Sequence, residues 1–244
     1  MALSPLLKHL NIETDQTGFY KGFNTFVTLG SKILIGVLIL WAAVWPDKAG
    51  QILQSVNSWL LGHFGHWYMY VVFFYIIVCV GLALWPPAGR IKLGLLDEKP
   101  EFSNFSWFSM MFGAGIGIGM LTYATAEPIY HWGNNPSVII GAVDAQTAGN
   151  IRPAFQWSFL HWGFSARGCY ALVGLTLAFF SYSRGLPLTI RSGLTPLFGK
   201  ALSGPLGHVV DIVSVIATIL GVSVTIGYGV SQFASGIFNI SGVG

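Results

Sequence analysis

Apolar residues occur in long runs along this chain, and shorter polar segments separate the runs. A helix needs about 20 mostly apolar residues to cross roughly 30 Å of hydrocarbon. About five runs approach or exceed that length, near residues 25–45, 67–86, 107–129, 155–182 and 209–238. The pattern predicts an all-α integral membrane protein, with about five transmembrane helices in a single membrane domain over residues 1–244.

The composition supports a membrane location. Of the 244 residues, 53% are hydrophobic and 9% are charged, whereas an average soluble domain carries about 25% charged residues. The net charge of +3 is too small and too dispersed to indicate a nucleic-acid partner. Cys79 and Cys169 lie inside apolar runs, so we interpret them as small buried hydrophobes rather than as a disulfide or metal ligands.

The basic residues predict the orientation of the helices. They gather in the N-terminal segment and in the second and fourth hydrophilic stretches, at Lys8, Lys21, Arg90, Lys92, Lys99, Arg184, Arg191 and Lys200. Because cytoplasmic loops retain Lys and Arg, residues 1–24 and those two stretches are predicted to lie inside. Segment 184–208 is read either as a short interfacial helix on the inner leaflet or as an ordinary loop.

Glycine occupies every second position from Gly113 to Gly119 in the third run. Glycines spaced by two residues cannot all serve one helix face, so this stretch should unwind easily. Unwound backbone at membrane depth is tolerated where it lines a cavity or coordinates an ion. The alternative is a small-xxx-small packing surface, formed by Gly113 with Gly117 or by Gly115 with Gly119.

The fourth run mixes aromatic and small residues. Trp162 and Tyr170 lie about 80° apart on a helical wheel, so both can face one cavity. Aromatic faces bind quaternary ammonium groups through their quadrupoles. Aromatic residues that only pack or face lipid are commoner, and that interpretation stays open for this pair.

Together these segments resemble the betaine/choline/carnitine transporter (BCCT) family. The matching segments are 109–119, Glu127-Pro128, His161-Trp162, 170–174, 184–187 and 211–229. The resemblance implies two peripheral helices over 25–86, followed over 107–244 by the first three helices of an inverted repeat of the LeuT type. The family is roughly twice this length, so we expect an incomplete fold that corresponds to its N-terminal part.

The resemblance also implies a substrate site. Trp162 and Tyr170 correspond to members of the family's aromatic box. Gly115, Gly117 and Gly119 correspond to the flexible stretch that contacts the region of the substrate carboxylate. The box needs both repeats, so this chain alone is not expected to complete it.

An ion site is implied as well, with Na⁺ or H⁺ as the coupling ion and no other cofactor. Gly113 and Ile116 correspond to backbone-carbonyl ligands of sodium. Thr218 corresponds to one of two threonines that bind a second sodium. The other position is Val222, which offers no side-chain oxygen, so proton coupling and exchange both stay open.

Arg167 stands where the family normally has another box tryptophan. A cation near the middle of a transmembrane helix costs about 2.5–3.5 kcal/mol on insertion scales, so it needs a partner or a water-filled cavity. As a substrate-binding residue, Arg167 would repel a trimethylammonium group and alter substrate choice. The alternative is a replaced tryptophan in a damaged or variant copy, with impaired transport.

Three further polar residues are interpreted as structural. His161 is read as a hydrogen-bonded core histidine, although it could titrate in a proton-coupled cycle. Glu127 is read as a local cap or pair. Asp211 is read as a carboxylate that opens the fifth helix and complements its dipole.

The leading hypothesis is a secondary active transporter of glycine betaine, choline, carnitine, dimethylsulfoniopropionate or a related zwitterion, working by ion-coupled alternating access. An ion-independent exchanger and a truncated, non-transporting fragment are the alternatives. An enzyme is not expected, because the sequence shows no nucleophile with a paired base, no metal-ligand spacing and no phosphate-binding loop. By resemblance we expect a homotrimer in a bacterial plasma (inner) membrane, with a role in osmoprotection.

Overall fold

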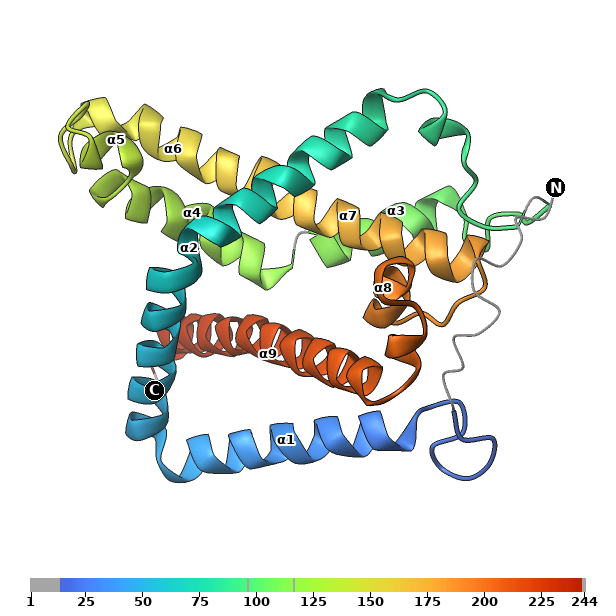
Figure 1. Cartoon of the computed structure of the whole chain (residues 1–244). Helices are drawn as coiled ribbons and strands as arrows, with labels where there is room; N and C mark the ends of the chain where they lie inside the picture. The colour runs from blue at the N-terminus through green and yellow to red at the C-terminus, as the bar shows by residue number, and fades with distance from the viewer. Residues whose placement is uncertain (1–13, 96, 116, 243–244) are drawn as a thin grey trace. The chain divides into compact units, whose positions relative to one another are not determined.

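The computed structural model describes residues 14–95, 97–115 and 117–242, and all regular elements among these residues are helical (Figure 1). They form two compact units. The first comprises Met1–Asp97 and Gly168–Thr218, and the second comprises Glu98–Arg167 and Ile219–Gly244. The prediction of an all-α membrane protein is confirmed, while the LeuT-type arrangement of the helices stays a prediction.

Among the described residues, four helical segments are long and apolar enough to cross a membrane. They are Thr25–Val44, Pro46–Leu84, Ala148–Ser183 and Pro205–Ser241. The remaining predicted run, 107–129, is divided between two shorter helices, α3 (Asn104–Gly115) and α4 (Ile118–Gly133). The prediction of about five spans therefore becomes four continuous helices and one broken run.

The first unit begins with α1 (Thr25–Val44) and α2 (Pro46–Leu84). Asn24 caps α1 through its side chain, which accepts a hydrogen bond from the Val27 N–H at 3.0 Å. Pro46 starts α2, where its missing N–H costs nothing. Residues 46–66 lie outside the predicted apolar runs but are helical as well, because the glycines after Pro46 do not break a sequence of otherwise good helix formers.

The rest of the first unit includes the C-terminal part of the helical segment Ala148–Ser183 and the N-terminal part of Pro205–Ser241. Its elements are the 3₁₀ turn η1 (Ala88–Arg90), α7 (Ala166–Ala178) from Gly168 on, the π-helix η4 (Phe179–Ser183), α8 (Ile190–Phe198), the 3₁₀ turn η5 (Gly199–Ser203) and α9 (Pro205–Ser241) up to Thr218. Segment 184–208 thus contains a helix, α8, while its position on the inner leaflet stays a prediction. Gly168 allows α7 to approach α2, because a Cβ there would lie 3.0 Å from Ile76.

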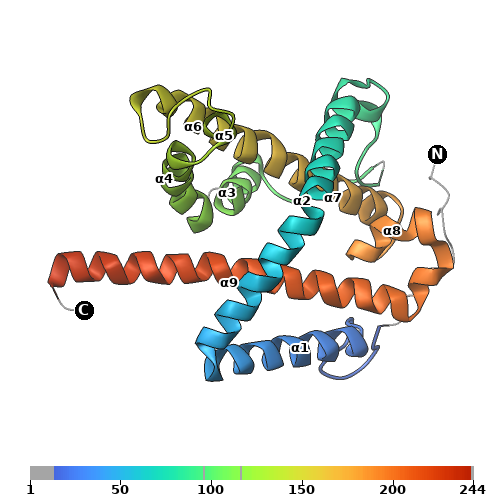
Figure 2. The same ribbon diagram turned by 60° about the vertical axis from the view of Figure 1, so that its left-hand side comes forward.

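The second unit is built around an antiparallel pair of helices, α4 and α6 (Ile151–Phe159), which lie side by side in both views (Figures 1 and 2). Its other elements are α3, α5 (Pro136–Ile139), the 3₁₀ turn η2 (Ala148–Asn150), the π-helix η3 (Leu160–Ser165) and α9 from Ile219 on. Because the chain reverses between α4 and α6, residues near the middle of α4 face residues that follow α6.

Two buried asparagines close this reversal. Asn135 Nδ2 donates to Asn150 Oδ1 at 2.7 Å and to the His131 carbonyl at 2.6 Å. Asn150 Nδ2 donates to the Trp132 carbonyl at 2.6 Å. The polar connection between α4 and α6 is therefore a hydrogen-bonded corner that sets how the two helices meet.

Burial follows the pattern of a protein in lipid. The buried residues include Glu127, Asn135, Asn150, Arg191 and Asp211, whereas large apolar side chains are exposed along every long helix. Lipid tails are as apolar as these side chains, so polar groups rather than apolar ones must find partners inside the protein.

Candidate functional site

The glycine-rich stretch interrupts the helix, as its spacing predicts. Helix α3 ends at Gly115 and α4 begins at Ile118, with Gly117 extended at φ −69° and ψ 173°. A Cβ added at Gly113 would meet nothing within 4 Å, which gives no support to a close packing surface there. Ile116 lies outside the described residues, and Gly119 lies in the first turn of α4.

Among the predicted site residues, Trp162 contacts both a buried carboxylate and a second aromatic ring. Its indole Nε1 donates to Oε2 of Glu127, a buried carboxylate on α4. The Tyr123 ring lies 5.9 Å from the Trp162 ring, centroid to centroid. The indole is therefore held at one edge by a charge and is flanked by a second aromatic ring.

Glu127 has two histidine neighbours in addition to Trp162. Its Oε1 lies 2.6 Å from His161 Nδ1 and 3.4 Å from His131 Nε2. Glu127 pairs locally with His131, as its interpretation allowed, but it also connects α4 to residues 34 and 35 positions further on. Sequence reasoning left it out of the site, although a carboxylate inside a membrane run is by default a sign of function.

The π-helix η3 explains why two adjacent residues reach one carboxylate. Successive side chains of an α-helix point about 100° apart, and the wider i→i+5 turn of a π-helix reduces that angle. His161 and Trp162 both lie in η3, and their ring centroids are 5.6 Å apart. His161 is hydrogen-bonded as predicted, but its side chain is 60% exposed, so the prediction of a core position was wrong.

The second part of α9 adds polar contacts to the other side of Tyr123. The hydroxyls of Tyr123 and Tyr228 are 2.9 Å apart, with their rings edge to face. One turn further, Gln232 Nε2 donates to Thr122 Oγ1 at 2.8 Å. These two contacts fix α4 to α9 and make Trp162, Tyr123 and Tyr228 a continuous aromatic row.

Arg167 lies beside α4, and no acidic side chain pairs with it among the described residues. Its Nη2 is 3.4 Å from Met120 Sδ, and a thioether is a weak acceptor. No ion pair of Arg167 occurs among residues 14–95, 97–115 and 117–242. The partner expected for a cation at this depth is therefore not found in the described part of the chain.

The other predicted site residues are divided between the units. Tyr170, on α7, belongs to the first unit and is 72% exposed. Thr218 is the last residue of the first unit, and its hydroxyl donates to the Ser214 carbonyl at 2.8 Å. Gly113 and Trp162 belong to the second unit. A box of Trp162 with Tyr170, and a sodium site that includes Thr218, thus stay predictions.

Asp211 does not open its helix. Helix α9 begins at Pro205, so Asp211 lies beyond the first turn, where the helix dipole acts. It forms an ion pair with Arg191 of α8 instead.

These features define a multi-pass α-helical membrane protein with a broken helix and a buried carboxylate that holds an aromatic side chain. The family model described as "BCCT, betaine/carnitine/choline family transporter" matches residues 26–244, and the chain belongs to that family.

Named relatives agree with this membership. The chain is 39% identical over 226 residues to a probable glycine betaine transporter of Desulfitobacterium hafniense (strain Y51), covering 93% of this chain and 44% of the relative. It is 38% identical over 206 residues to the glycine betaine transporter OpuD of Bacillus subtilis (strain 168), covering 84% of this chain and 39% of the relative. It is 39% identical over 216 residues to the high-affinity choline transport protein of Escherichia coli (strain K12), covering 88% of this chain and 31% of the relative. The chain thus spans less than half the length of these relatives.

Proposed function

We propose that this chain takes part in secondary active transport of a quaternary-ammonium solute or a related zwitterion, such as glycine betaine, choline, carnitine or dimethylsulfoniopropionate. The observation that carries the proposal is the Trp162 indole, held by the Glu127 carboxylate beside Tyr123. A fixed aromatic face is the surface that attracts a quaternary ammonium group. The names of the relatives support the same class of substrate.

Within this proposal, Trp162 and Tyr170 contact the ammonium group of the substrate. Gly115, Gly117 and Gly119 supply backbone groups to its carboxylate, and Gly113, Ile116 and Thr218 contribute to sodium binding. The helix break supports these roles, because α3 and α4 leave backbone groups near Gly117 outside any helix. A bacterial inner membrane, a cytoplasmic N-terminus and a homotrimer complete the proposal.

Uptake measurements test the function. The chain is joined to the C-terminal half of a relative, because it spans less than half of each one, and is expressed in transporter-deficient bacteria. We expect uptake of radiolabelled glycine betaine or choline, and loss of that uptake in Trp162→Ala. The control is Trp59→Ala, at an exposed tryptophan of the first unit. Equal uptake by both variants, or none by any form, would remove the substrate assignment.

The same assay decides what Arg167 does. If Arg167→Trp raises the uptake of glycine betaine, the arginine impairs an ordinary box. If the arginine form transports a different, anionic solute and the tryptophan form does not, Arg167 sets specificity. Its guanidinium contacts Met120 and has no anionic partner in the part of the chain that the structure describes, which supports a role in binding a negatively charged group.

An ion-independent exchanger is the second candidate, and Val222 is the residue that favours it. Thr218 bonds to its own helix, and Val222, four residues on, adds no oxygen to that face. Counterflow into preloaded vesicles without an ion gradient would support exchange. A gain of sodium dependence in Val222→Thr would support coupled transport through a repaired site. A fragment that does not transport would show neither.

A further inference from the structure

The Glu127 carboxylate lies between two imidazoles that come from different elements. His131 is on α4 with Glu127, and His161 is on η3. Both histidines approach the same oxygen, Oε1, at 3.4 and 2.6 Å, while the other oxygen accepts the Trp162 N–H. Histidine is the side chain that ordinarily exchanges its proton near neutral pH, so the cluster has the composition of a proton site.

Exposure decreases from the rim of this cluster to its centre. The side chain of His161 is 60% exposed, that of His131 is 18% exposed and that of Glu127 is 9% exposed. Of the two histidines, His161 is therefore the one less enclosed by the described residues, and the carboxylate is the buried centre of the cluster.

We propose that Glu127, His131 and His161 form a proton-binding site whose occupancy is transmitted to the Trp162 indole. The proposal rests on the transport function and deepens it, because it names the proton as a coupling ion. Without the proton, His161 donates its Nδ1–H to Glu127 Oε1 and keeps Nε2 as an acceptor. The incoming proton binds Nε2, so the site gains one positive charge and no hydrogen bond is lost.

His131 is less suited to carry this proton. Its Nε2 is the nitrogen near Glu127, whereas its Nδ1 is buried and has no hydrogen-bond partner in the described part of the chain. A proton at Nδ1 would be a buried donor without an acceptor, which carries a desolvation cost. His131 therefore stays neutral and helps to orient the carboxylate, and His161 holds the exchangeable proton.

Trp162 senses the proton because it shares the carboxylate with His161. When the carboxylate has its full charge, the indole N–H donates a charge-assisted hydrogen bond, which is stronger than a neutral one. An imidazolium at Oε1 neutralises much of that charge, so Oε2 becomes a weaker acceptor and the indole moves more easily. Coupling is reciprocal, so a ligand that moves Trp162 changes how tightly the site holds its proton.

The remaining titratable groups around the site do not exchange protons at neutral pH. Tyr123 and Tyr228 contribute phenols, which are ordinarily uncharged there. Arg152 lies near the start of α6, and Arg167 lies just after η3. An arginine side chain keeps its positive charge throughout this pH range. Helix α5 and the part of α9 from Ile219 on contain no Asp, Glu, Lys, Arg or His.

Fluorine NMR of the chain in lipid nanodiscs tests the site. The chain is labelled with 5-fluorotryptophan, and the Trp162 resonance is assigned by its absence from Trp162→Phe. Between about pH 8 and about pH 5, where histidine titrates, we expect that resonance to shift in one step. His161→Gln should abolish the step, because its amide still donates to Glu127 but takes up no proton.

His63→Gln is the matched control. His63 lies on α2, with Nδ1 at 2.8 Å from the Trp59 carbonyl, so its loss should leave the Trp162 step unchanged. The His63 ring lies 4.6 Å from the Trp59 ring, so the Trp59 resonance is left out of the comparison. Unchanged resonances of the remaining tryptophans show that each variant is folded. A Trp162 resonance that does not respond to pH, or a step that survives His161→Gln, overturns the proposal.

A second measurement needs no substitution. The ¹⁵N shifts of the His161 ring should titrate with the same midpoint as the Trp162 resonance, and different midpoints overturn the coupling between them. The uptake assay keeps the two proposals apart. Uptake without a pH step removes the proton site and leaves the transport function, whereas a pH step without uptake supports the site and counts against transport.

Discussion

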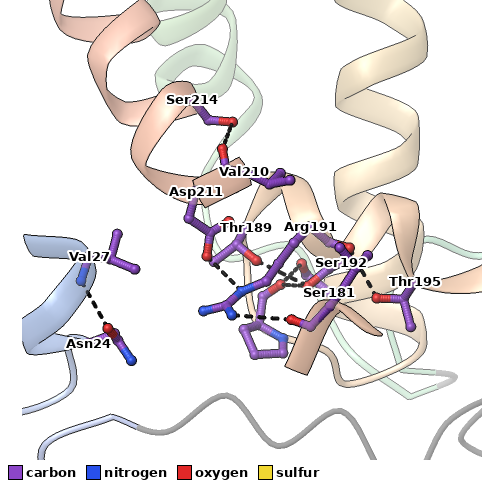
Figure 3. A network of polar contacts seen from close by, with 12 residues as sticks. Asn24, Val27, Ser181, Thr189, Arg191, Ser192, Thr195, Val210, Asp211 and Ser214 are labelled. Atoms are coloured by element: carbon purple, nitrogen blue, oxygen red, sulfur yellow. Dashed lines mark hydrogen bonds and ion pairs between the residues drawn. The ribbon is translucent and has the colours of Figure 1, made fainter. Parts of the chain in front are cut away.

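Arg191 Nε lies 2.6 Å from Asp211 Oδ2, with the two side chains 1% and 8% exposed (Figure 3). Arg191 comes from α8 and Asp211 from the early turns of α9, so the ion pair ties the helix of segment 184–208 to the next long helix. Arg191 Nη1 also donates to the Leu202 carbonyl at 3.4 Å. One guanidinium thus organises the connection between the two helices.

Removing one partner of this pair should destabilise the first unit. Asp211→Asn leaves a buried guanidinium without its counter-charge, which typically costs about 3–5 kcal/mol. Reversible unfolding in mixed micelles of dodecyl sulfate and maltoside measures this loss. The exposed Asp47→Asn is the control and should change little. The double change Arg191→Met with Asp211→Leu should cost less than Asp211→Asn alone, and an equal or greater cost would contradict this account.

Gly207 should not accept a side chain. A Cβ there would lie against the Leu202 carbonyl oxygen and 2.9 Å from Arg191 Nη1. Overpacking typically costs about 1–3 kcal/mol, so Gly207→Ala should lower the free energy of unfolding by that amount or more. Gly227→Ala, on the same helix with nothing within 4 Å of the added carbon, should be neutral or stabilise the chain by up to about 1 kcal/mol. Thermal unfolding in detergent compares the two, and equal midpoints would refute the steric argument.

Asn150 should stabilise the corner between α4 and α6. Its side chain bonds Asn135 and the Trp132 carbonyl, and it is fully buried. Asn150→Ala removes both hydrogen bonds, while Asn135 still donates to the His131 carbonyl and the Trp132 carbonyl still accepts from the Gln146 N–H. We therefore expect a loss of about 0.5–1.5 kcal/mol for each bond removed. Asn57→Ala, at an exposed position of α2, is the control. Amide hydrogen exchange should rise in residues 133–151 of the Asn150 variant, and no local change would rule out this role.

The hydroxyl pair of Tyr123 and Tyr228 should contribute to the contact between α4 and α9. A double-mutant cycle of Tyr123→Phe and Tyr228→Phe isolates the bond, which spans 2.9 Å. We expect a coupling free energy of about 0.5–1.5 kcal/mol in unfolding measurements. Tyr130→Phe is the control, because Tyr130 is 64% exposed. A coupling energy of zero would mean that the bond contributes nothing.

Arg167 should oppose membrane insertion of its helix. It forms no ion pair among the described residues, so Arg167→Leu should lower the apparent insertion free energy by about 3 kcal/mol. A glycosylation-mapping assay of segment 148–183 measures this change. Arg152→Leu, near the end of the same segment, should have a smaller effect, because the cost of a charge falls towards the interface. Equal effects would indicate that Arg167 is not at depth.

Much of the architecture was predictable from local pattern. Uninterrupted apolar runs located the four long helices and the broken one, because a membrane span needs a fixed length of apolar residues. The spacing of the glycines predicted the break near Gly117. The apolar runs did not locate the first half of α2, residues 46–66, because a helix tolerates polar residues when no strong breaker follows Pro46.

The candidate site was predictable only in part. The sequence by itself determined the class of protein and the family resemblance, and it named Trp162 as a candidate site residue, since these follow from composition and motif. Only the tertiary structure decided that Glu127, His131 and His161 meet at that tryptophan, because the turn at Asn135 and Asn150 brings α4 against η3. It likewise decided that Asp211 pairs with Arg191 rather than opening a helix. A buried charge must find a counter-charge in three dimensions, and its sequence neighbours do not reveal which one.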